Sequence, residues 1–172
     1  SKTKFFTHDP QAFLTLLKYE ISNVKTKAEA LEQKLAFRLN VFSALPWEKM
    51  TPWLFKAFPD IQFYDYTKYP DRFDSLPKNY HLTYSASERN SDEDIKNLLR
   101  KKVNVTVVAD KVNGQVPATW NRFKVHDGDV NDYRPADPKG VIVFLKPKGR
   151  AISKVKAPRG GFIRTTEGFK VA

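Results

Sequence analysis

Cysteine is absent from this 172-residue sequence, glycine occurs only seven times, and no long hydrophobic run is present. Without cysteine, disulfides, thiolate nucleophiles and cysteine-based zinc or iron–sulfur sites are excluded. No apolar stretch approaches the roughly 20 residues that a membrane span needs, and the first residues show no signal-peptide pattern. We therefore expect a soluble intracellular protein with no membrane partner.

Several motifs with known chemistry are also missing. No glycine-rich P-loop and no GxGxxG sequence follows a predicted strand, so the sequence does not support a nucleotide-binding cradle. The histidines His8, His81 and His126 are too scattered to support a zinc site. No His-hydrophobe-His pair with a downstream tyrosine occurs, so rolling-circle initiator chemistry lacks its metal ligands.

Hydrophobic residues make up 41% of the chain, and thirteen residues are phenylalanine, which is typical of a globular protein with a real core. Helical and strand-like patterns alternate along the chain. They predict a helix over about 10–33, short helices near 51–59 and after Ser91, and strands at 35–43, 61–67, 80–86, 103–109, 120–125 and 141–145. Asn113-Gly114 predicts a hairpin turn.

This alternation predicts an α/β fold: a single domain with a mainly parallel sheet, crossover helices and an added hairpin near the C-terminus. A partial or irregular barrel is the alternative arrangement of the same strands. We expect the domain to cover residues 1–150 and a basic C-terminal extension to cover 151–172.

Positive charge is concentrated at the C-terminal end. The formal net charge is +11, and residues 139–172 hold nine basic residues against one acid, a net charge of +8. Such a stretch attracts polyanions through counterion release, and the alternative is a tail that only promotes solubility. The predicted nucleic-acid-binding residues are Lys146, Lys148, Arg150, Lys154, Lys156, Arg159 and Arg164, with Tyr66 as a base-stacking ring and Lys68 beside it.

One loop concentrates acidic residues. Residues 126–137 contain four aspartates, Asp127, Asp129, Asp132 and Asp137, together with His126 and Arg134. The carboxylates of Asp127, Asp129 and Asp132 suit a hard cation such as magnesium or calcium, and magnesium is the candidate cofactor. Glycine and proline favour the alternative of a simple turn, and a third possibility is that Arg134 or the basic tail pairs with the aspartates.

Polar residues also follow the predicted parallel strands at their carboxyl ends, where α/β proteins gather their functional groups. Asp65 is the strongest candidate for a functional residue among them, because it lies between two tyrosines inside a strand, where aspartate is disfavoured. His126 is a candidate general base next to Asp127. The candidate catalytic residues are Asp65, Asp127, Asp129 and His126.

Several segments together resemble the gene-product-88-like family of bacteriophage proteins. They include RLNVFS at 38–43, FYDYTK at 63–68, HLTYS at 81–85, PATW at 117–120 and the stretch from HDGD at 126 to VIVFL at 145. The resemblance covers residues 9 to 165, and family members begin with a cysteine-bearing segment that this chain lacks. It implies a phage origin and a site among the matching polar positions Asn40, Asp65, Tyr66, Lys68, Asp127, Asp129, Asp132 and Arg134.

Three functions follow as hypotheses for a protein in the host cytoplasm. The first is nucleic-acid binding in phage DNA metabolism or takeover of the host. The second is a metal-dependent phosphodiester hydrolase that uses Asp65, Asp127 and Asp129, because carboxylates can hold a cation that activates water. The third is a non-catalytic factor that binds an acidic host or phage protein.

Overall fold

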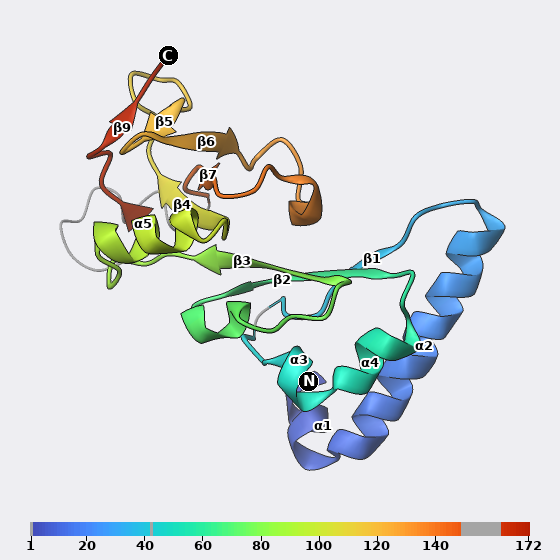
Figure 1. Cartoon of the computed structure of the whole chain (residues 1–172). Coiled ribbons are helices and arrows are strands. Elements are labelled where there is room, and N and C mark those ends of the chain that lie inside the picture. The colour runs from blue at the N-terminus through green and yellow to red at the C-terminus, as the bar shows by residue number, and fades with distance from the viewer. Residues whose placement is uncertain (1, 42, 149–162) are drawn as a thin grey trace.

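The computed structural model describes residues 2–41, 43–148 and 163–172, and its strands form one nine-stranded sheet (Figure 1). The order across the sheet is β1-β2-β3-β4-β7-β6-β5-β9, and β8 pairs with β4. Strands β1, β2, β3, β4, β7 and β6 run parallel to one another, whereas β5 is antiparallel to both β6 and β9. The predicted α/β fold with a mainly parallel sheet is confirmed.

The strands are short. Their bounds are β1 Ala36–Arg38, β2 Gln62–Thr67, β3 Tyr80–Ser85, β4 Val105–Ala109, β5 Thr119–Trp120, β6 Phe123–Asp127, β7 Ile142–Leu145, β8 Ile163–Arg164 and β9 Phe169–Lys170. The α-helices are α1 Lys2–His8, α2 Pro10–Ala30, α3 Trp47–Met50, α4 Pro52–Ala57 and α5 Asp92–Arg100. The 3-10 helices are η1 Pro70–Phe73 and η2 Arg134–Ala136.

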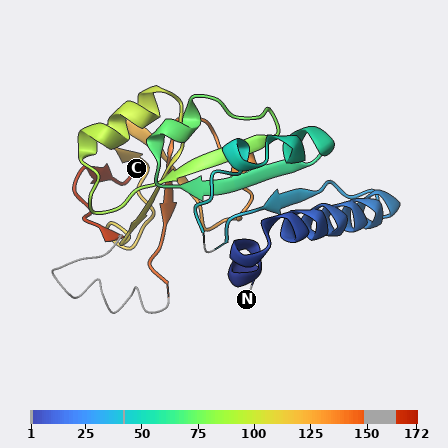
Figure 2. The same ribbon diagram turned by 90° about the horizontal axis from the view of Figure 1, so that it is seen from below.

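The helix starts follow local sequence signals. The Asp9 side chain accepts a hydrogen bond of 3.0 Å from the Ala12 amide, and Pro10 takes the first helical position of α2. Ser91 and Asp94 form a complete capping box at α5. Figure 2 shows α2 extending beside β1. In the described part of the chain, no helix is both long and apolar enough to cross a membrane.

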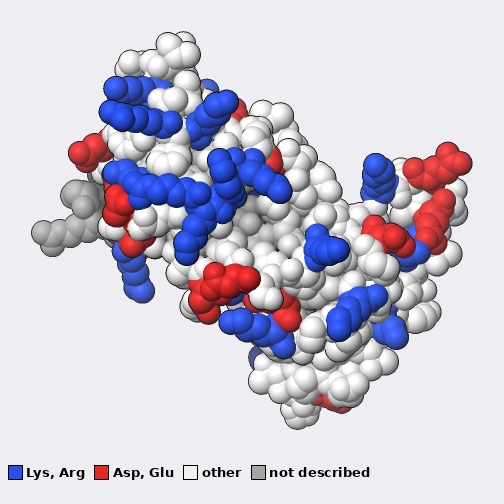
Figure 3. All heavy atoms as spheres, in the orientation of Figure 1, with Lys and Arg blue, Asp and Glu red and all other residues white. Residues whose placement is uncertain are grey.

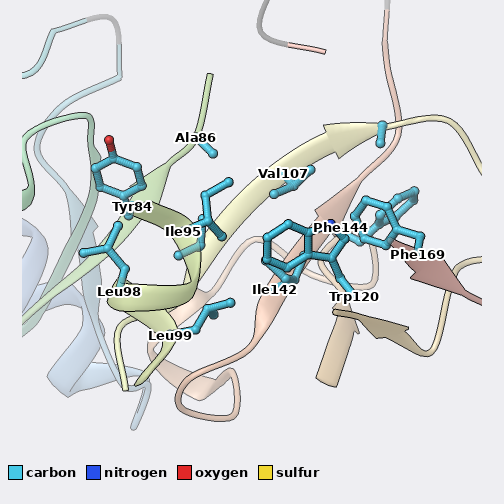
Figure 4. Close-up of a cluster of buried hydrophobic side chains, with 12 residues drawn as sticks. Tyr84, Ala86, Ile95, Leu98, Leu99, Val107, Trp120, Ile142, Phe144 and Phe169 are labelled. Carbon is cyan, nitrogen blue, oxygen red and sulfur yellow. The ribbon is translucent and has the colours of Figure 1, made fainter. Parts of the chain in front are cut away.

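Two hydrophobic clusters lie against the sheet. One packs Ile95 and Leu99 of α5 against central strands and includes Trp120 and Phe169 from the antiparallel end (Figure 4). The other packs α2, α3 and α4 against β2 and β3. Phe73 contacts both clusters and therefore joins them into one core.

The region 112–127 contains two tight turns. Asn113 and Gly114 have φ of 51° and 76°, and Val112 bridges to Gln115, so the predicted hairpin turn is confirmed. The predicted single strand over 120–125 is wrong, because Asn121 and Arg122 have φ of 44° and 73° and divide it into β5 and β6. Neither residue is glycine, so the sequence carried no strong turn signal.

Strand register sorts the polar residues onto opposite faces of the sheet. Tyr66 pairs with Thr83, which shares a face of β3 with Ser85. Ser85 pairs with Thr106, Thr106 with Val143, and Val143 with His126, so Tyr66 and His126 lie on the same face of the sheet. Asp65 points to the opposite face, which the hydrophobic clusters cover. The described part of the expected C-terminal extension, 163–172, adds β8 and β9 to the sheet.

Candidate functional site

Arg134 is the centre of the acidic loop. Its side chain is fully buried, and its Nη2 donates to the Gly128 carbonyl at 3.1 Å and to the carbonyl of Asn131. Its Nη1 lies 3.3 Å from Oδ2 of Asp137, which is also buried. A buried guanidinium with these partners closes the loop upon itself, as the salt-bridge alternative predicted for Arg134.

Gly128 is required at its position by a close approach. A Cβ atom there would lie 2.6 Å from Nη1 of Arg134 and 2.6 Å from Cγ1 of Val143. Real Cβ atoms do not approach other atoms this closely, so any larger residue would push the loop away from β7. The turn interpretation and the Arg134 interpretation of this loop are therefore two aspects of one structure.

His126 pairs with a different aspartate from the one expected. Its Nε2 lies 3.2 Å from Oδ1 of Asp137, whereas Asp127 accepts a hydrogen bond of 3.0 Å from the Asp129 amide. Burial raises the pKa of Asp137, and the charges of Arg134 and His126 oppose that shift. The imidazole is held by a buried carboxylate, with 31% of its side chain exposed. Nothing in the spacing of the loop distinguished Asp137 from its neighbours.

Asp129 anchors the start of the basic segment. It accepts a hydrogen bond of 3.0 Å from the Lys146 amide, and its oxygens lie 3.6 Å and 2.7 Å from the Nζ atoms of Lys146 and Lys148. Burial alone would raise the pKa of Asp129, but the two lysines hold it below the usual value. Lys146 and Lys148, expected on phosphates, are thus partly neutralised by this carboxylate.

The predicted magnesium ligands do not form a cluster. Asp129 faces lysines, Asp127 caps a backbone amide, and Asp132 is exposed. Within residues 2–41, 43–148 and 163–172, no group of three or more His, Cys, Asp or Glu side chains is placed to hold a metal ion.

Asp65 belongs to a buried network on the helix side of the sheet. It is 0% exposed and accepts hydrogen bonds from the Asn40 amide at 2.6 Å, the Asn40 side chain at 3.2 Å and the Tyr80 hydroxyl at 2.8 Å. Burial raises its pKa to about 6, although these donors and the charges of Arg38 and Arg72 lower it. Such donors explain why a strand tolerates aspartate here.

The network continues into a buried ion pair. The Arg72 guanidinium donates to both carboxylate oxygens of Glu48, at 2.9 Å and 2.7 Å, and to the Tyr80 hydroxyl at 3.2 Å. This chain of contacts joins η1, α3, β2 and β3. Apart from Nη1 of Arg72, which is buried without a hydrogen-bond partner, its members satisfy one another's polar side-chain atoms. Such a network helps to fix the packing of the domain.

Asp65, Asp127 and Asp129 are therefore not brought together. Strands β3, β4 and β7 separate β2 from β6 in the sheet, and each carboxylate has its own partners. Tyr66 is half-buried, with the Arg38 guanidinium 4.7 Å from its ring centre, so one ring face is already covered. Lys68 is exposed after the end of β2.

The remaining predicted cations have varied surroundings. Arg164 is half-buried and structural: its Nη1 donates to the carbonyls of Ser87 and Asn90 at 3.0 Å and 2.8 Å, and its Nη2 lies 2.7 Å from Asp92. Arg150, Lys154, Lys156 and Arg159 lie outside the described residues.

A basic cavity, missed by the sequence analysis, lies between α5 and the β5–β6 hairpin. Its volume is about 850 Å³, and its lining residues are Lys96, Arg100, Thr119, Asn121, Arg122, Phe123, Gly168 and Lys170. Lysine and arginine side chains gather over this part of the molecule in Figure 3. The cations come from segments far apart in sequence, so no local motif announced them.

Strand register extends the positive surface beyond the cavity. Thr119 of β5 pairs with Lys124 of β6 on one side and with Lys170 of β9 on the other, which aligns both lysines on one face. Arg122, Lys124 and Lys170 are exposed, and no acidic side chain among the described residues forms an ion pair with them. Arg100, by contrast, forms an ion pair with Glu93, in which Nη1 of Arg100 lies 2.6 Å from Oε1 of Glu93.

Fold and surface define the class: a single α/β domain with a mainly parallel sheet and a basic antiparallel end. The sequence model of the family described as gene product 88 matches residues 1–164, so the chain belongs to this bacteriophage family of unknown function. The resemblance stated from the sequence motifs is confirmed. No curated protein matched the chain, and no solved structure matched it either.

Proposed function

We propose that this protein binds nucleic acid in the host cytoplasm, in phage DNA metabolism or takeover of the host. The observation that carries the proposal is the basic cavity together with Lys124, which the strand register aligns with Lys170 of the cavity lining. Arg122, Lys124 and Lys170 lack carboxylate partners among the described residues, whereas Lys96 and Arg100 pair with Glu93. Unpaired cations can exchange their counterions for phosphates. The interface differs from the one expected at Lys146 and Lys148.

The net charge of +11 supports the same function from a distance. A strongly positive protein draws polyanions towards itself and speeds their encounter. We propose the basic cavity as the site at which the attracted polyanion binds. An acidic protein would be attracted by the same positive charge. Binding to an acidic host or phage protein is therefore distinguished from nucleic-acid binding only by a competitor that carries carboxylates and no phosphates.

The test neutralises three unpaired cations, Arg122, Lys124 and Lys170, each to Gln. Binding of a fluorescent oligonucleotide is measured by anisotropy across a salt series. Three lost phosphate contacts should weaken binding about a hundredfold near 0.1 M salt and reduce the slope of log K against log salt by about two to three.

The matched control changes Lys18, Lys34 and Lys56 to Gln. These residues are exposed on or near α2 and α4, so the control loses equal charge at a distance from the basic cavity. It should lose much less affinity. Equal losses in both triple variants, or binding that is independent of salt, would contradict the proposed interface. Equal competition by polyglutamate of matched charge would favour an acidic protein partner.

The hydrolase hypothesis has weaker support. Its carboxylates Asp65, Asp127 and Asp129 have separate protein partners, and no described cluster suits a metal. His126 with Asp137 keeps a general-base arrangement, but within the described part of the chain no hydrogen bond joins the imidazole to a hydroxyl group. We therefore do not extend the proposal to catalysis.

A further inference from the structure

We infer that the basic cavity binds an unpaired nucleotide of a single-stranded nucleic acid. This inference rests on the proposed function and names the substrate class of the same surface. The cavity combines cations with a half-buried aromatic ring, Phe123, and with half-buried polar side chains, Thr119 and Asn121. A positively charged groove with an aromatic platform is the arrangement that binds single strands.

The cavity has the size of a small-molecule site. Its volume of about 850 Å³ falls in the range of cavities that enclose a ligand, which is enough for a base and its sugar. Arg122 and Lys170 are exposed and have no carboxylate partner among the described residues, so they are available to phosphates. Phe123 is half-buried and presents an apolar surface to a base. A paired base inside a duplex cannot reach such a surface.

Among the described residues, the helix and the hairpin beside the cavity are poor fits to a duplex groove. The helix α5 buries Ile95, Leu98 and Leu99, and its exposed residues include the acidic Glu93 and Asp94, which would repel phosphates. The β5–β6 turn consists of two residues only. Duplex readers instead insert a helix or a β-ribbon into the major groove.

The backbone of Arg122 gives independent support. Its φ of 73° is in the left-handed region, where arginine is strained and the turn would favour glycine. The strained turn places Arg122 and Phe123 side by side in the cavity lining. Strain of this kind persists where a side chain is needed, and Arg122 supplies a cation that glycine lacks.

The first experiment compares three probes on the unchanged protein at one salt concentration: a ten-nucleotide thymidine strand, an abasic strand with the same phosphates, and a ten-base-pair duplex. One stacked base should make the thymidine strand bind about tenfold more tightly than the abasic strand. It should also bind more tightly than the duplex. Equal affinity for the thymidine and abasic strands would overturn the inference.

The second experiment uses Arg122→Gly and Phe123→Leu. Arg122→Gly should raise Tm by about 3 °C, because strain is released, and yet weaken binding of every probe. Phe123→Leu should remove the preference for thymidine over the abasic strand and leave abasic binding unchanged. If Phe123→Leu fails to fold, the abasic comparison on the unchanged protein decides alone.

The two failures are distinguishable. If no probe binds, or binding ignores salt, the proposed function fails together with the inference. If all three probes bind equally and lose affinity with salt, the proposed function stands and the unpaired-nucleotide site is refuted. If Arg122→Gly lowers Tm, the backbone at Arg122 is not strained and does not support the nucleotide site.

Discussion

At the scale of single residues, the aspartates of this chain have different roles that their surroundings decide. Asp65 is enclosed by neutral donors, Asp129 by lysines, and Asp137 by Arg134 and His126. In sequence they look alike. Their pKa values diverge because burial raises the pKa of Asp65 more than its donors and the charges of Arg38 and Arg72 lower it, while two nearby lysines lower that of Asp129.

Asp65→Asn should change how stability depends on pH. The pKa of Asp65 is about 6 in the folded protein and about 3.9 in an unfolded chain, so the folded state holds the proton more tightly. The stabilisation that the protonated Asp65 carboxyl group gives to the folded state is complete below about pH 4. It is lost as pH rises through 6, which lowers the unfolding free energy by about 3 kcal/mol in total. Between pH 4 and pH 7 the unfolding free energy of the variant should therefore gain about 2 kcal/mol relative to the unchanged protein, because part of the loss lies outside this pH range.

Urea denaturation at pH 4 and pH 7 measures this difference. Asp110→Asn is the control, because Asp110 is exposed just after β4. The control should follow the unchanged protein at both pH values. A parallel pH dependence of Asp65→Asn and Asp110→Asn would show that the buried network does not perturb Asp65.

At the scale of elements, the C-terminal strands β8 and β9 depend on contacts with segments far earlier in the chain. Arg164 of β8 binds the start of α5, and the amides of Ala118 and Asn121 donate to carbonyls of Lys170 and Gly168 at 2.8 Å and 3.0 Å. A residue expected on phosphates thus fastens the end of the chain to the sheet.

Arg164→Gln should loosen this attachment. Loss of a charged hydrogen-bonding group that is half-buried should cost about 2 kcal/mol of unfolding free energy. Hydrogen exchange of the Ala118 and Asn121 amides should accelerate, while the Tyr84 amide, which donates to Asn104, stays protected.

Arg89→Gln is the matched control for Arg164→Gln, because Arg89 is exposed in the same loop region. It removes the same charge and should leave exchange unchanged. If Arg164→Gln weakens oligonucleotide binding strongly and leaves the amides protected, Arg164 belongs to the nucleic-acid interface after all.

At the scale of the whole molecule, one sheet and Phe73 connect the two hydrophobic clusters. The chain should therefore unfold in a single transition. Trp47 lies in the α3–α4 cluster and Trp120 in the α5 cluster, and both are buried, so each reports on its own half.

Two variants separate these signals: Trp53→Phe with Trp120→Phe leaves Trp47 as reporter, and Trp53→Phe with Trp47→Phe leaves Trp120. Within each variant, the fluorescence midpoint in urea should coincide with the midpoint from circular dichroism, which follows the whole fold. A fluorescence midpoint that departs from the circular dichroism midpoint in either variant would show that the clusters unfold separately.

Much of the fold was predictable because its signals are local. Asp9-Pro10 and the Ser91 capping box marked helix starts, and apolar runs marked β2, β3, β4 and β7. The β5–β6 turn was missed, since Asn121 and Arg122 adopt positive φ without a glycine. The helix α1 was missed as well, because its first residues read as a polar, basic segment.

The sequence by itself determined the family, the α/β class and the positive charge, because motifs, periodicity and composition are properties of the linear chain. Only the tertiary structure decided which charges meet. It paired His126 with Asp137, covered Asp129 with Lys146 and Lys148, and left Arg122 and Lys170 free of described carboxylates. Ion pairing depends on distances of a few ångströms between residues far apart in sequence, and folding alone sets those distances.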